Sequence, residues 1–62
     1  MTHEEYIMVG AMTQYGGSFA VALAECIRKA DPINRAKLKL AFPELWEKYT
    51  EMGLEDIDAN KI

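Results

Sequence analysis

The sequence has little of what most enzymes and metal sites need. Its 62 residues include one histidine and one cysteine, too few for a closed zinc site or for a nucleophile beside its base. The lone Cys26 excludes a disulfide within one chain, and a free thiol suits a reducing compartment. Glu4 and Glu5 stand where a secretory signal carries basic residues, and no apolar run approaches the length of a membrane span. We therefore expect a cytoplasmic protein with no metal, other cofactor, membrane association or enzymatic activity.

The chain is also short for a self-sufficient fold. Half of its residues are hydrophobic and its net charge is only −3, so it should fold rather than stay disordered. At this length a single core seldom supplies more than ~3–5 kcal/mol without disulfides, metal or oligomerisation. Because neither a disulfide nor a metal is expected, self-association is the remaining source of stability.

No segment shows the alternation of apolar and polar residues that is typical of a strand. Helix start signals are present instead. Thr2 and Glu5 form the pattern of a capping box, Asp31 precedes a proline suited to the first helical position, and Phe42 precedes Pro43. These signals predict an all-α bundle of about four short helices, which cover residues 2–15, 18–30, 32–42 and 43–52.

The C-terminal residues are predicted to lie outside the bundle. Gly53 is placed to end the fourth helix, and the sequence LEDIDANKI that follows is polar enough to form a loosely held tail. The expected organisation is one helical domain over residues 1–53 and a tail over residues 54–62.

Residues 14–19, QYGGSF, look more like a ligand-binding loop than any other segment. A phosphate-binding loop follows a strand and contains a lysine, but a helix precedes this segment and no lysine follows before Lys29. We therefore interpret it as a corner. Gly16 would adopt left-handed geometry to close the first helix, Gly17 would redirect the chain, and Ser18 would cap the second helix.

The second and fourth helices are each expected to bury one apolar face. Helical spacing in the second predicts a buried stripe of Phe19, Ala22, Leu23, Cys26, Ile27 and Ala30. Cys26 would then be a small core hydrophobe rather than a reactive thiol. The fourth helix is predicted to bury Leu45, Trp46, Tyr49 and Met52.

The first helix differs because its apolar residues point in nearly every direction around its axis. Three short helices cannot cover such a helix completely, whereas a second copy of the chain could, with Gly10 and Ala11 allowing a close approach. The predicted self-interface consists of Tyr6, Met8, Met12 and Tyr15, with Trp46 and Tyr49 as a secondary candidate if the fourth helix is partly exposed. The alternative for each of these residues is ordinary core packing or partial exposure.

Charge is unevenly distributed along the chain. Residues 28–39 contain five basic residues against one acid, and the residues after them contain six acids against two lysines. The candidate basic patch consists of Arg28, Lys29, Arg35, Lys37 and Lys39. One interpretation is a helix-turn-helix that presents Arg35 and Lys39 to DNA. The other, which we favour, is that basic and acidic faces balance one another within the domain or between copies.

Residues 18–49 contain three motifs, ALAE, ADPIN and KLKLAFPELWEKY. In these motifs the chain resembles a group of small, mostly uncharacterised helical proteins of phages, prophages and mobile elements. The resemblance implies an accessory protein of phage type with unassigned activity, and it brings no catalytic residues. Combined with the residue patterns, it predicts a protein-interaction module that associates with itself and with a protein partner of unknown identity. A small nucleic-acid-associated regulator is the alternative.

Overall fold

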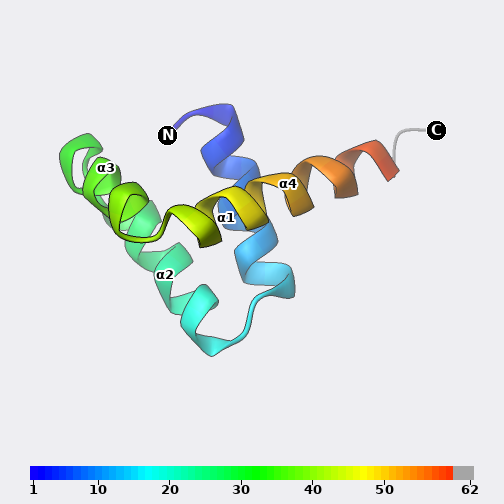
Figure 1. The fold of residues 1–62 in the computed structure, drawn as a ribbon, viewed down its shortest axis with the longest axis horizontal. Coiled ribbons are helices and arrows are strands. Elements are labelled where there is room, and N and C mark those ends of the chain that lie inside the picture. Colours follow the sequence, from blue (N-terminus) through cyan, green and yellow to red (C-terminus); the bar gives the residue numbers. More distant parts are fainter. Residues whose placement is uncertain (60–62) are drawn as a thin grey trace.

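The computed structural model describes residues 1–59, which form four α-helices and no strand. The helices are α1 (His3–Tyr15), α2 (Ser18–Lys29), α3 (Pro32–Ala41) and α4 (Pro43–Ala59), as Figure 1 shows. The prediction of an all-α fold with four short helices is confirmed.

Three of the helix starts form where the sequence signals place them. The Thr2 amide donates to Glu5 Oε1 at 2.8 Å and the Glu5 amide donates to Thr2 Oγ1 at 3.1 Å, which completes the capping box of α1. Asp31 caps α3 by accepting from the Asn34 amide at 2.7 Å. At φ −129° and ψ 57° Phe42 leaves the helical region, and α4 begins at the proline that follows.

The corner between α1 and α2 forms for a different reason than the one predicted. Gly16 has φ −80° and ψ 156°, so left-handed geometry is wrong for this residue. The N-cap of α2 is Gly17, with no side-chain cap, and Ser18 is the first helical residue. A Cβ on Gly16 would lie 2.5 Å from both Ala20 Cβ and the Met12 carbonyl oxygen. A glycine is therefore required here because any side chain would clash with these atoms, and not because of the backbone conformation.

Gly53 does not end α4, so the predicted boundary is wrong. The helix continues to Ala59, and residues 54–59 of the predicted tail are helical, while residues 60–62 lie outside the described part. Gly53 is buried, and a Cβ there would overlap Ile7 Cγ2 and lie 2.9 Å from the Ile7 carbonyl oxygen. The missing side chain lets the backbones of α1 and α4 approach closely.

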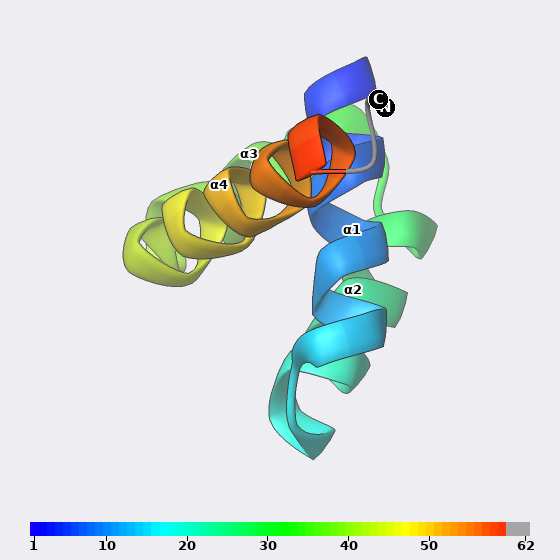
Figure 2. The same cartoon turned by 90° about the vertical axis from the view of Figure 1, so that its right-hand side faces the viewer.

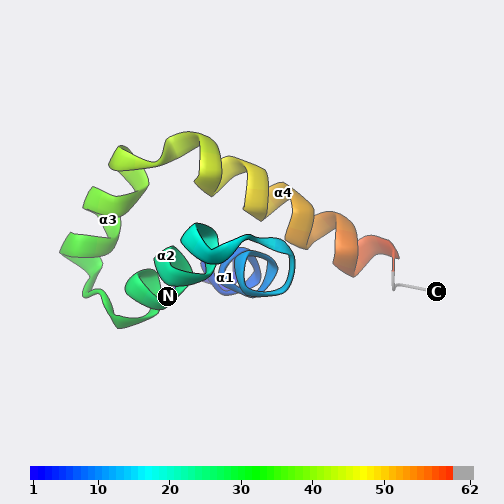
Figure 3. The same ribbon diagram turned by 90° about the horizontal axis from the view of Figure 1, so that it is seen from below.

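α1 is the central helix because both α2 and α4 pack against it. α4 crosses α1 (Figures 1 and 2), and α3 and α4 curve around the α1–α2 pair (Figure 3). α3 contacts the others little and contains no buried residue. An edge-on contact between Phe19 and Phe42, with ring centroids 5.7 Å apart, links α2 to the corner between α3 and α4.

The core lies where α2 and α4 meet α1. Its buried residues are Met8, Val9, Ala11, Met12, Ala20, Leu23, Ala24, Ile27, Trp46 and Tyr49. The buried face of α2 differs from the predicted stripe because it includes Ala20 and Ala24. These small side chains allow α1 to approach closely. Cys26 is exposed and Phe19 is 59% exposed, so their predicted burial is wrong.

Candidate functional site: two grooves and their charged rims

The structure separates the six residues predicted for a self-interface. Met8 and Met12 are at most 1% exposed, and Trp46 and Tyr49 are also buried in the monomer. These four fill the core and present no surface to a partner, so their proposed interface role is corrected. α2 and α4 pack on two sides of α1, and as expected they do not cover this helix completely. Only Tyr6, 70% exposed, and Tyr15, 46% exposed, still offer contact area.

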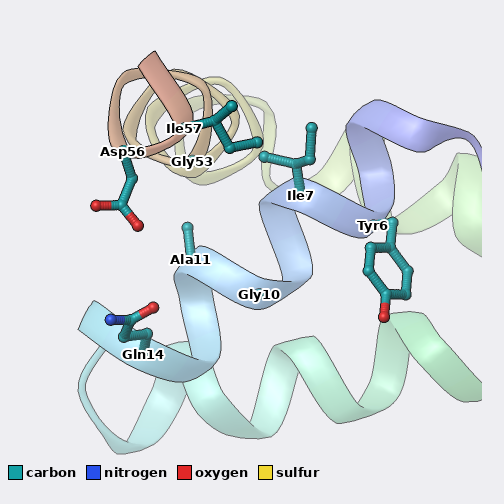
Figure 4. A pocket seen from close by; sticks show the side chains of 8 residues that line it. All are labelled: Tyr6, Ile7, Gly10, Ala11, Gln14, Gly53, Asp56 and Ile57. Carbon is teal, nitrogen blue, oxygen red and sulfur yellow. The ribbon is translucent and has the colours of Figure 1, made fainter. Parts of the chain in front are cut away.

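The α1–α4 groove runs along the contact between these two helices (Figure 4). It has a volume of about 210 Å³ and is lined by Tyr6, Ile7, Gly10, Ala11, Gln14, Gly53, Asp56 and Ile57. Ile7 and Ile57 face each other between the helices, whereas the Tyr6 side chain points away from α4. Gly10 is exposed with open space around its Cα. The groove is apolar along most of its length but shallow.

Tyr15 connects the end of α1 to α4 beside this groove. Its hydroxyl donates a hydrogen bond to the Asp56 carboxylate, and that bond, with smaller contributions from desolvation and the carboxylate charge, raises the pKa of Tyr15. The ring is still partly exposed. Tyr15 therefore has a structural role within the monomer in addition to its exposed area.

The α2–α3 groove is larger, with a volume of about 570 Å³. It is lined by Cys26, Lys29, Ala30, Asn34, Lys37, Leu38 and Ala41. Its surface is largely apolar, and Lys29 from α2 and Lys37 from α3 bring two cations to it. This groove was missed in the sequence because Cys26 was assigned to the core.

The face of α3 beside Lys37 carries exposed apolar side chains. Ile33 is 71% exposed and Leu40 is 82% exposed. Residues 33, 37 and 40 are three or four positions apart and so lie on one side of the helix. The rim of the α2–α3 groove therefore continues into an apolar strip that nothing in residues 1–59 covers.

The other residues of the candidate basic patch do not join this surface. Arg28 donates to Glu25 Oε1 at 2.7 Å and to Thr13 Oγ1 at 3.0 Å. Arg35 donates to the Ala30 carbonyl oxygen at 2.8 Å and so satisfies the end of α2. Lys39, two positions from Lys37, is on the opposite side of α3 and lines a hollow with the start of α1. The five basic residues therefore form no single surface.

The outer face of α4 is strongly acidic. Five exposed carboxylates recur every three or four residues and form one stripe: Glu44, Glu47, Glu51, Glu55 and Asp58. The ion pairs within the described part of the chain join Glu25 to Arg28 at 2.7 Å and to Lys29 at 3.9 Å. None of the five stripe residues has a cationic partner there.

Residues 1–59 contain no cluster of histidine, cysteine and carboxylate side chains placed to hold a metal ion. No helix among them combines the length and apolar character needed to cross a membrane. Comparison with protein-family models, with curated proteins and with solved structures finds no match to this chain. The resemblance over residues 18–49 to phage-type helical proteins therefore stays a prediction.

Proposed function

We propose that this chain is a small non-enzymatic protein-interaction module that associates with a second copy of itself. The observation that carries the proposal is the apolar surface that the fold leaves uncovered. Within residues 1–59, the buried hydrophobic residues number ten, three of them alanine, against nine large hydrophobic residues that stay exposed. Single exposed apolar residues are ordinary, but here they outnumber the large side chains of the core.

α3 gives the proposal its most specific support. A helix of ten residues is marginal in water by itself and normally depends on packing an apolar face. This helix buries no residue completely, and Ile33 and Leu40 are its most exposed apolar side chains. A second molecule on this face would supply the burial that the monomer lacks.

The charge layout favours a protein partner over nucleic acid. Arg28 and Arg35 are already engaged within the chain, and Lys37 and Lys39 lie on different sides of α3. The acidic stripe on α4 would also repel phosphate groups. A helix-turn-helix that reads DNA needs several cations on one face of the recognition helix, and α3 does not supply them.

Sedimentation velocity over a range from low micromolar to near-millimolar protein tests this proposal. We expect the mass to rise with concentration from that of the 7.0 kDa monomer toward a dimer or a larger species. Replacing two exposed apolar side chains together, Ile33→Ser and Leu40→Ser, should weaken association about tenfold or more, given ~1.5–3 kcal/mol for each fully buried large side chain. Val21→Ser, on another helix, is the control. A chain that stays monomeric at every concentration would refute the proposal.

A further inference from the structure

We infer that the α2–α3 groove receives the acidic outer face of α4 from a second copy of the chain. The inference rests on the proposed self-association and names the two surfaces that carry it. It follows from the fit between these surfaces in shape, polarity and charge.

The receiving surface is an apolar trough with cations beside it. Ala30, Leu38 and Ala41 contribute apolar lining, while Lys29 and Lys37 come from the two helices that form the trough. The Lys29 side chain is 81% exposed, and its distance of 3.9 Å from Glu25 leaves most of its charge in solvent. Such a surface suits an amphipathic helix that carries acidic residues beside an apolar one.

The outer face of α4 has this composition in its last turns. Leu54 is 41% exposed, and Glu51, Glu55 and Asp58 lie around it at helical spacing. These turns extend beyond the other three helices in Figures 1 and 3, so another molecule can approach them from the outer side. Leu54 would enter the trough and the carboxylates would meet the lysines.

A chain cannot make this contact with itself. α3 lies at one end of the long axis, which measures 37 Å, and the C-terminal turns of α4 lie at the other (Figures 1 and 3). Each copy therefore carries one basic groove and one acidic helix end that only another copy can bring together. Complementary charges of this kind select the partner and the register as well as adding affinity.

Charge reversal on each surface tests the contact directly. The groove variant Lys29→Glu/Lys37→Glu and the helix variant Glu55→Lys/Asp58→Lys should each associate about tenfold more weakly than the natural chain, because attraction becomes repulsion at two positions. An equimolar mixture of the two variants should associate again, since each then offers a surface complementary to the other. All four side chains are exposed, and circular dichroism will verify that both variants stay folded.

Matched variants separate local contact from overall charge. Lys39→Glu/Gln14→Glu/Ser18→Glu changes the net charge as much as the groove variant, and Glu4→Lys/Gln14→Lys/Ser18→Lys changes it as much as the helix variant. These four exposed residues lie neither in the α2–α3 groove nor on α4. Neither control should weaken association by the same factor. If each control weakens association as much as the groove or helix variant of the same net charge, the effect comes from net charge and the inference is overturned.

Cys26 provides a second readout because its thiol is exposed and lines the groove. We expect alkylation of Cys26 to slow as protein concentration rises into the associated range, and to remain fast at the same concentration in the helix variant, whose groove is unchanged. A natural chain that associates while Cys26 stays equally reactive would place the interface elsewhere. In that case self-association stands and only this inference fails, whereas a strictly monomeric chain removes both.

Discussion

Two helical glycines provide a test of how closely α1 and α4 approach. Gly10 is in the middle of α1 and Gly53 is in the middle of α4, so alanine should improve the helix propensity of both sites equally. Their surroundings differ. A Cβ on Gly10 would meet no atom within 4 Å, whereas a Cβ on Gly53 would lie 2.9 Å from the Ile7 carbonyl oxygen and closer still to the Ile7 side chain.

The expected free energies follow from these distances. Gly10→Ala should stabilise the fold by about 1 kcal/mol, the usual difference in helix propensity. Gly53→Ala gains the same propensity, but it must also push α4 away from the backbone of α1, and overpacking of this kind typically costs ~1–3 kcal/mol. Gly53→Ala should therefore be neutral to destabilising, by up to about 2 kcal/mol, because a carbonyl oxygen cannot move aside as a side chain can.

Thermal and urea unfolding followed by circular dichroism will measure both variants, at a protein concentration low enough to keep the chain monomeric. Gly10→Ala should raise the Tm by about 4–8 °C, the shift that 1 kcal/mol produces in a domain of this size. Gly53→Ala should leave the Tm unchanged or lower it. If both substitutions raise the Tm equally, α1 and α4 are not in close backbone contact and the account of Gly53 is wrong.

Three further outcomes are expected from local features of the fold. Gly16→Ala should lower the Tm in unfolding experiments, because its Cβ would lie 2.5 Å from Ala20 Cβ. Asp31→Ala removes the cap of α3 and should destabilise this helix by about 1 kcal/mol. Because α3 buries no residue, we expect this destabilisation to appear as faster amide hydrogen exchange within α3 and not as global unfolding. The hydrogen bond from Tyr15 to Asp56 raises the pKa of Tyr15 in the folded chain. The stability that this hydrogen bond adds to the fold is therefore fully present below the ordinary pKa of 10.0, and it is lost as the pH rises through the raised pKa. Unfolding measured across alkaline pH should therefore show a steeper loss of stability in the natural chain than in Tyr15→Phe.

Local signals in the sequence predict the helix starts, because each depends on neighbouring residues alone. The capping box at Thr2, the Asp31 cap and the break at Phe42 need no knowledge of the rest of the fold. Gly53 shows where such signals stop being sufficient. A glycine near the end of an apolar pattern can terminate a helix or admit a neighbouring helix, and only the position of Ile7 across the interface decides between them.

The buried face of α2 was misassigned for a related reason. Leu23 and Ile27 belong to both the predicted and the observed stripe, so the stripe can be centred on either side of them. Hydrophobicity favours the side with Phe19, while close helix packing favours the side with Ala20 and Ala24. The observed face is the one with small side chains, because it allows α2 to approach α1.

The candidate site depends on where the charged side chains lie in the folded chain, which the number of charges along the sequence does not reveal. The spacing of Lys37 and Lys39 already indicates opposite sides of a helix, and the fold places only Lys37 in the α2–α3 groove. Lys29 reaches the same groove from another helix, and this convergence depends on the angle at which α3 leaves α2. Asp31 and the proline after it signal that corner without fixing its angle. Of the five basic residues in this segment, only two therefore line the groove. Two cations are too few to hold a nucleic acid backbone, but they match a few carboxylates on one turn of a partner helix.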